Sequence, residues 1–197
     1  MKKRSLACII FACVILAQLG LPGWLIARHE LTLARGEPVK FKVRPVDPYD
    51  PFRGRYVNLE LEQTTAPLPE GYRPERGTKV YVPIKLGRDG FAKLGHARPE
   101  PPSGGPYIKC RVRATDGNRA RLDMPLSRYY MEGRLAQPAQ TATRQRAMDG
   151  DVWVQARLWR GHAVIVQLYV GDTTIRQYLQ QRNEHTRGAE APALPGA

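Results

Sequence analysis

The chain has 197 residues, of which 42% are hydrophobic, and it carries 31 Lys and Arg against 18 Asp and Glu. One membrane segment followed by one domain of about 150 residues accounts for this length, and such a domain can bury a core. The net charge of +13 favours a negatively charged partner, although a solvated basic surface explains the same excess. Only Cys110 among the three cysteines lies beyond the N-terminal segment, which excludes a disulfide-stapled scaffold.

The N-terminal segment predicts a transmembrane helix. Ser5–Ile26 contains 22 residues without a charge, enough for a helix to cross a hydrocarbon core of about 30 Å. Cations at residues 2–4 precede this run, and Trp24 and Arg28 suit the opposite interface, so we expect a cytoplasmic N-terminus. A cleaved signal peptide with a site near Thr32–Ala34 is the alternative, but the apolar run exceeds the usual signal-peptide length. The prediction is a single-pass inner-membrane protein with its domain in the periplasm.

The remaining pattern predicts three parts: an anchor at 1–28, a β domain at 36–180 and a disordered tail at 183–197. Val39, Phe41 and Val43 alternate with cations as in a strand that is buried on one side. We expect an antiparallel β-sandwich or a partly open β-barrel.

Turn residues divide the domain into hairpins. Two of the predicted hairpins are the clearest, one pairing 107–113 with 119–123 and the other pairing 152–158 with 164–170. Arg88-Asp89-Gly90 predicts a further turn into Phe91, and Pro83 indicates a sheet edge or a bulge. Residues 139–148 predict one short helix after Pro138.

The stretch from Arg44 to Leu61, RPVDPYDPFRGRYVNLEL, is the most constrained part of the chain. Its prolines keep the backbone extended, and Asp47 and Asp50 each precede a proline, where a carboxylate can close a turn. Tyr56–Leu61 then alternates as a half-buried strand. The sequence thus predicts a strand, a rigid corner and a second strand.

This stretch resembles the first motif of the GDYXXLXY protein family, with Arg55 in place of the family's Asp and Leu61 in place of its final Tyr. Tyr129-Tyr130 shortly before Glu132-Gly133 is similar to the second motif. The resemblance implies a membrane-anchored bacterial protein, encoded beside multi-pass membrane proteins, with no known biochemical activity. It therefore implies a location and a type of partner, namely a multi-pass membrane protein.

The two motifs concentrate polar and aromatic side chains, and we expect their turns to meet at one end of the sheet as a shared binding site. An arginine of one motif would then pair with a carboxylate of the other. The alternative is that these groups only lock the corner to the domain. The candidate residues are Asp47, Asp50, Arg53, Arg55, Tyr56, Arg128, Tyr129, Tyr130 and Glu132.

The hairpin at 107–123 presents five cations on one predicted face, and we call these residues the basic ribbon. Their mutual repulsion favours an anionic surface, either lipid headgroups or an acidic protein loop, unless solvent screens them. A nucleic acid is not expected outside the cytoplasm, and the face has a single aromatic for base stacking. The basic ribbon consists of Lys109, Arg111, Arg113, Arg119 and Arg121.

The sequence gives little support to catalysis. Its three serines, at 5, 103 and 127, lack a nucleophile setting, and no phosphate-binding glycine motif occurs. The four histidines, His29, His96, His162 and His185, lack ligand spacing, so no metal or cofactor is expected. We expect a binding or accessory module for another envelope component, and the alternative is an envelope hydrolase that uses Asp47, Asp50 or Glu132.

Overall fold

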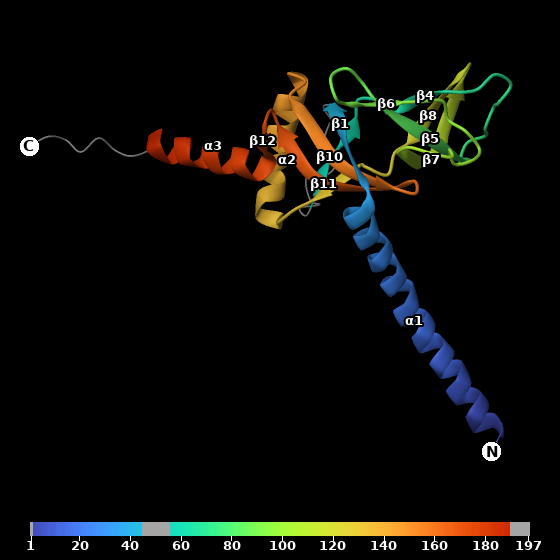
Figure 1. Cartoon of the computed structure of the whole chain (residues 1–197). Coiled ribbons are helices and arrows are strands. Elements are labelled where there is room, and N and C mark those ends of the chain that lie inside the picture. The colour runs from blue at the N-terminus through green and yellow to red at the C-terminus, as the bar shows by residue number, and fades with distance from the viewer. Residues whose placement is uncertain (1, 45–55, 190–197) are drawn as a thin grey trace, which may run out of the picture.

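The computed structural model describes residues 2–44 and 56–189, without the side chains of residues 2–10, 12, 183 and 185–189. Two helices, α1 (Lys2–Arg35) and α3 (Ile175–Ala189), extend from a β body in different directions (Figure 1). The prediction of a mainly β domain is confirmed.

The first sheet has five strands in the order β12-β11-β10-β1-β3, with antiparallel pairing throughout. Valine and phenylalanine side chains of β1 are buried in the predicted alternation. The predicted hairpin of β10 and β11 turns at Arg160 and Gly161, whose φ angles of 48° and 78° suit a two-residue type I′ turn. The strands are β1 (Glu37–Arg44), β3 (Glu60–Leu61), β10 (Val152–Trp159), β11 (His162–Val170) and β12 (Thr173–Thr174).

The second sheet has the order β4-β8-β7-β5-β6 and contains the other two predicted hairpins. Gly90, with φ 76°, turns β5 into β6 as the sequence predicts. Pro83 lies inside this sheet, where the residues of β5 that pair with β7 give way to those that pair with β6. Neither pairing has a register shift there, so the predicted edge or bulge is wrong. The strands are β4 (Thr65–Pro67), β5 (Lys79–Leu86), β6 (Ala92–Leu94), β7 (Tyr107–Asp116) and β8 (Arg119–Asp123).

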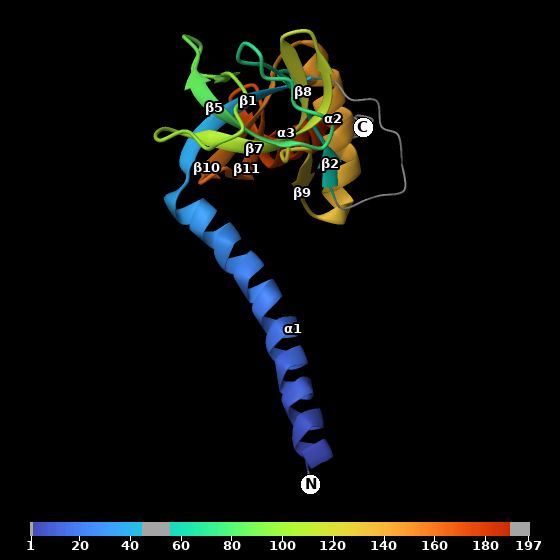
Figure 2. The same cartoon turned by 90° about the vertical axis from the view of Figure 1, so that its right-hand side faces the viewer.

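Two isolated bridges join these sheets into a nearly closed, barrel-like body (Figure 2). Lys40 of β1 pairs with Phe91, and Ile108 of β7 pairs with Gly161 in the β10–β11 turn. The Lys109 N–H donates to the Gly161 carbonyl over 2.9 Å. Of the two predicted architectures, the structure favours the partly open barrel.

The core is built from the inward positions of both sheets and from the inner faces of the helices. Burying these apolar side chains is the main stabilising contribution to the fold. Its fully buried members include Val57, Leu68, Val80, Val82, Ile108, Leu126, Val152, Val154, Leu168 and Ile175.

The predicted strand Tyr56–Leu61 is corrected, because it divides between two sheets. Its first half, β2 (Tyr56–Asn58), pairs with β9 (Arg128–Tyr130) in a separate two-stranded sheet, while Glu60 and Leu61 pair with β1. The ion pair of Arg44 and Glu60 joins β1 to β3. The division at Leu59 lets one segment connect the β9 surface to the main body.

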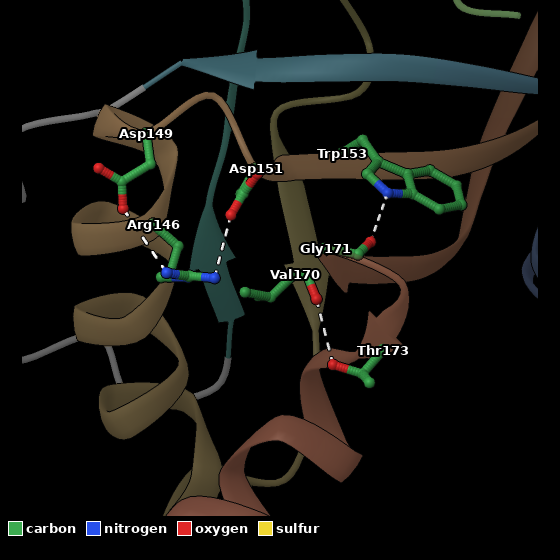
Figure 3. Close-up of polar contacts among 7 residues, drawn as sticks. All are labelled: Arg146, Asp149, Asp151, Trp153, Val170, Gly171 and Thr173. Carbon is green, nitrogen blue, oxygen red and sulfur yellow. Dashed lines mark hydrogen bonds and ion pairs between the residues drawn. The ribbon is translucent and has the colours of Figure 1, made fainter.

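The second helix, α2 (Gly133–Met148), begins earlier than residue 139, so the predicted start is wrong. Pro138 lies within its second turn, where a missing N–H removes a single intrahelical bond. At the other end, Arg146 contacts Asp149 at 3.7 Å and Asp151 at 3.0 Å (Figure 3). These contacts join the end of α2 to the start of β10.

The third helix continues beyond residue 183, where the sequence predicts that the tail begins. Thr174 and Gln177 form a reciprocal cap: the Gln177 N–H donates to Thr174 Oγ1 at 3.3 Å, and the Thr174 N–H donates to Gln177 Oε1 at 3.1 Å. Ile175 and Leu179 anchor the helix in the core. Residues 190–197 of the predicted tail lie outside the described residues.

The last turns of α1 are fixed to the first sheet. Thr32 is fully buried, and the Gly36 N–H donates to its carbonyl over 2.9 Å. A Cβ at Gly36 would lie 2.9 Å from the Cβ of Arg157, so glycine permits this close approach. Arg157 in turn donates from Nη1 to the Gly36 carbonyl at 3.1 Å.

The predicted membrane span, Ser5–Ile26, lies within α1, and the side chains of its residues 5–10 and 12 are outside those described. Among the residues that are described, no helix is sufficiently long and apolar to cross a membrane.

Candidate functional site

The two family-like motifs meet in the sheet of β2 and β9. Tyr56 lies opposite Tyr130, and Asn58 lies opposite Arg128, in antiparallel register. Alternation places these four side chains on the outer face of the small sheet and turns Val57 and Tyr129 inward. We call the outer four residues the motif face.

Ring and cation contacts organise the motif face. The Tyr56 and Tyr130 ring centroids lie 5.7 Å apart with the planes tilted by 59°. The Arg128 guanidinium lies over the Tyr56 ring, 5.1 Å from its centroid. A cation held over an aromatic face keeps its outer N–H groups available. Tyr130 is 66% exposed, so the face can contact another molecule.

Helix α2 and the loop before β9 hold β2 through hydrogen bonds to its backbone. The Asn58 N–H donates to Gln140 Oε1 over 2.8 Å, and the Leu59 N–H donates to the Ser127 carbonyl over 2.9 Å. These bonds satisfy two backbone groups that the short sheet leaves unpaired. The motif face is therefore held by a helix and a loop as well as by its own two strands.

A pocket of about 390 Å³ adjoins the motif face. It is lined by segments from three distant parts of the sequence, because the end of α1, β9 and β11 converge there. We call it the junction pocket. Its lining residues are His29, Pro125, Arg128, Tyr129, Tyr130, His162, Ala163, Val164, Ile165 and Val166.

Two histidines face each other across the junction pocket. The His29 and His162 ring centroids are 6.4 Å apart in an edge-to-face arrangement. Thr32 Oγ1 donates to the Arg28 carbonyl at 2.9 Å and lies 3.0 Å from His162 Nδ1. Since the hydroxyl hydrogen goes to Arg28, this network is satisfied when Nδ1–H of His162 donates to Thr32.

Burial alters the acid–base properties of two pocket residues. Burial lowers the pKa of His162, and the nearby Arg28 and His29 lower it further, so the neutral imidazole is favoured. Burial raises the pKa of Tyr129, although Arg176 opposes this shift, and its phenol stays protonated. Among the residues that the structure describes, no group of three His, Cys, Asp or Glu side chains could hold a metal ion.

Part of the predicted shared site lies outside the described residues, namely Asp47, Asp50, Arg53 and Arg55. The described members Tyr56 and Arg128–Tyr130 meet as paired strands, whereas the sequence predicts that the turns of the two motifs meet. Arg128 packs on Tyr56 instead of pairing with a described carboxylate. The two motifs nevertheless lie side by side.

Glu132 is the only carboxylate of the hydrolase alternative within the described residues. It occupies the N-cap position of α2 without a side-chain capping bond and lies 3.9 Å from Arg176 Nη1. Its side chain is 68% exposed, and an anion suits the positive end of a helix. This setting explains Glu132 without a catalytic role.

The basic ribbon lies on β7 and β8 as predicted, with its cations directed away from the buried Ile108, Cys110 and Val112. The pairing shifts register between Val112 and Ala114, which places Arg113 at a bulge. Arg111 lies opposite Asp123 and also donates to the Gly77 carbonyl at 3.2 Å.

The sequence interpretation missed the meeting of His29 and His162. Their spacing along the chain carries no signal, because one residue lies in the last turns of the N-terminal helix and the other begins β11. The Arg160-Gly161 turn was recognisable and places His162 at a strand start. Only the docking of α1 on that strand brings the two rings together.

Neither curated proteins nor solved structures give a match to this chain. A family model, described as GDYXXLXY protein, matches residues 18–168. This stretch covers both motifs, most of the barrel-like body and most of the chain. The protein therefore belongs to the GDYXXLXY protein family.

Proposed function

We propose that this protein is a membrane-anchored accessory module that captures another envelope component through the motif face and the junction pocket. The proposed partner is a multi-pass membrane protein. In this proposal α1 anchors the chain in the inner membrane with a cytoplasmic N-terminus, and the domain lies in the periplasm. No catalytic step is assigned.

The observation that carries the proposal is the pairing of β2 with β9. It joins the two family motifs in one exposed surface, with Arg128 and Tyr130 directed outward beside a pocket of about 390 Å³. Tyrosine and arginine are enriched at protein interfaces because they combine apolar area with hydrogen-bonding groups.

The position of the pocket supports a partner at the membrane surface. His29 belongs to the last turns of α1, three residues before the buried Thr32. Arg28 directly precedes His29, and Trp24 lies one turn before Arg28, with the guanidinium 5.4 Å from the indole centroid. A tryptophan and an arginine at a helix end are typical of a membrane interface. The proposed anchor would therefore hold the motif face close to the bilayer.

Capture is tested by pulling down the full-length protein in mild detergent and identifying what copurifies. Arg128→Ala and Tyr130→Ala should each release the partner while the melting temperature stays within 2 °C of wild type. The matched control is Arg134→Ala, an exposed arginine on α2 away from the pocket. Equal capture by all three variants, or no membrane protein in the wild-type sample, would refute the proposal.

The anchor is tested separately with a reporter that is active only outside the cytoplasm. The reporter is fused after Ala197, because a fusion within α3 would disturb the buried Leu179. We expect the reporter to be active, and the fusion protein to stay with the membranes when they are washed with alkali. Reporter activity confined to the cytoplasm would reject the proposed topology.

A further inference from the structure

We infer that Arg28, Lys79, Lys109 and Arg111 form a binding site for the phosphate of an anionic phospholipid headgroup. This inference deepens the proposed function and rests on its membrane anchor. The four cations line a pocket of about 370 Å³ beside the end of α1, together with Cys110, Asp123, Met124 and Pro125. We call it the basic pocket.

The sheet register brings three of these cations together. Lys79 of β5 lies opposite Arg111 of β7, and Arg111 lies opposite Asp123 of β8. Two cations and one carboxylate thus form one row across the sheet. Lys109 precedes Arg111 by two residues and therefore shares its face. Arg28 enters from α1, which is fixed by the buried Thr32.

The basic pocket has more positive charge than its single carboxylate can balance. Among the described residues, none of the four cations forms an ion pair with a carboxylate, and Asp123 forms no ion pair either. Their recorded contacts are with neutral groups: Arg28 with Trp24, Lys109 with Tyr81 at 5.6 Å, and Arg111 with a backbone carbonyl. An anion in the pocket would relieve their repulsion.

The chemistry of the lining favours phosphate over a metal or a reactive ligand. The Cys110 side chain is buried on the opposite face of β7, and burial raises the pKa of its thiol to about 12, so it adds no thiolate charge to the pocket. Its two guanidinium groups offer paired N–H donors and its two ammonium groups act as point charges, a combination that suits an anion with several oxygen acceptors. A volume of about 370 Å³ is within the range of small-ligand sites.

The position favours a lipid as the source of that phosphate. Arg28 is both a wall of the basic pocket and the partner of Trp24 on the helix that we propose as the anchor. Headgroup phosphates would lie at the depth of these two residues. Arg113, Arg119 and Arg121, the other cations of the basic ribbon, do not line the pocket. The basic ribbon therefore has a binding end, Lys109 and Arg111, and an outer end, Arg113, Arg119 and Arg121.

The test uses purified full-length protein in a non-ionic detergent and soluble short-chain lipids. Dioctanoyl phosphatidylglycerol should bind at least tenfold more tightly than dioctanoyl phosphatidylcholine, and Lys79→Gln with Arg111→Gln should remove this preference. Arg113→Gln with Arg121→Gln removes the same charge from the outer end and should change binding less than twofold. Unchanged melting temperatures verify folding of both double variants. If the Lys79/Arg111 pair unfolds, it is replaced by Lys109→Gln with Arg28→Gln; if the control pair unfolds, it is replaced by Arg119→Gln with Arg121→Gln, which also lie outside the pocket.

Three results would overturn the inference: no preference for the anionic lipid, equal losses in both double variants, or inorganic phosphate binding as tightly as the lipid. The last result would indicate a site for free phosphate. Partner capture is measured with Arg128 and Tyr130 variants, none of which lines the basic pocket. Failure of the lipid test with intact capture would therefore reject only this inference.

Discussion

Tyr56 and Tyr130 lie opposite each other on neighbouring strands, with ring centroids 5.7 Å apart, although each belongs to a different motif. Arg128 extends the contact by stacking on Tyr56. The motifs thus share one two-stranded sheet, whose outer face is exposed and whose inner face contributes Val57 and Tyr129 to the core. The inner face of these strands contributes to stability, and the outer face is the one that we propose for recognition.

Tyr129 and Tyr130 are adjacent in the sequence but lie on opposite faces, so we expect their replacement to affect stability differently. Tyr129 is 8% exposed, so Tyr129→Ala should lower the free energy of unfolding by about 3 kcal/mol. Tyr130 is 66% exposed, so Tyr130→Ala should cost about 0.5 kcal/mol or less. Urea denaturation of both variants measures the difference. Similar losses for both residues would show that the assignment of the faces is wrong.

The support of β2 by α2 predicts a specific role for Gln140. Gln140→Ala leaves the Asn58 N–H without its acceptor and should cost about 1–2 kcal/mol. Gln137→Ala on the exposed side of the same helix removes no described side-chain bond and should cost about 0.5 kcal/mol or less. Both variants replace glutamine with alanine on the same helix, so the change in helix propensity is the same. The difference between their unfolding free energies, measured with denaturant, therefore reports on the Gln140–Asn58 hydrogen bond. Equal losses would show that this bond contributes nothing.

Local signals explain why much of the body could be predicted from the sequence. Alternating apolar residues in β1, β7 and β10, together with glycines at Gly90 and Gly161, identify strands and turns within short windows. Thr174 and Gln177 also carry a local signal, a capping box that marks the start of α3. The charged composition of the residues that follow obscured that helix.

Long-range contacts explain what could not be predicted. The apolar pattern runs through Tyr56–Leu61 without a break, and only the competing partners β9 and β1 divide it at Leu59. Pro138 suggested a helix start, yet α2 tolerates it in the second turn. The basic pocket likewise depends on Arg28 of α1 meeting the row formed by Lys79 and Arg111, a meeting that no local pattern encodes.

The β10–β11 turn closes the barrel-like body, which makes Gly161 a sharper test than other glycines. A Cβ at Gly161 would lie 2.8 Å from Tyr107 Cε2, in addition to the cost of a positive φ, so Gly161→Ala should cost about 3 kcal/mol. Gly171→Ala also has a positive φ but meets nothing within 4 Å and should cost about 1 kcal/mol. Thermal unfolding compares them, and equal shifts would indicate that the contact with Tyr107 is unimportant.

The lowered pKa of His162 predicts how stability changes with pH. In the unfolded chain this imidazole takes up a proton near pH 6.5, whereas in the folded protein burial, Arg28 and His29 oppose protonation until lower pH. Between those two pKa values the unfolded state binds more protons, so stability should fall as the pH drops below about 6.5. Above that value both states are neutral, and His162 should contribute no pH dependence.

The contribution of His162 is isolated by comparing wild type with His162→Asn across pH 5–8. Asparagine can still donate an N–H toward Thr32 Oγ1, the group that lies 3.0 Å from His162 Nδ1, but it does not titrate. Every other ionisable group is present in both proteins, so the difference between the unfolding free energies of wild type and variant reports on residue 162. We expect wild type to lose stability more steeply than the variant on acidification from pH 7 to pH 5. Parallel curves, or a wild type that gains stability relative to the variant at low pH, would contradict the lowered pKa and the packing of His162 against α1 that causes it.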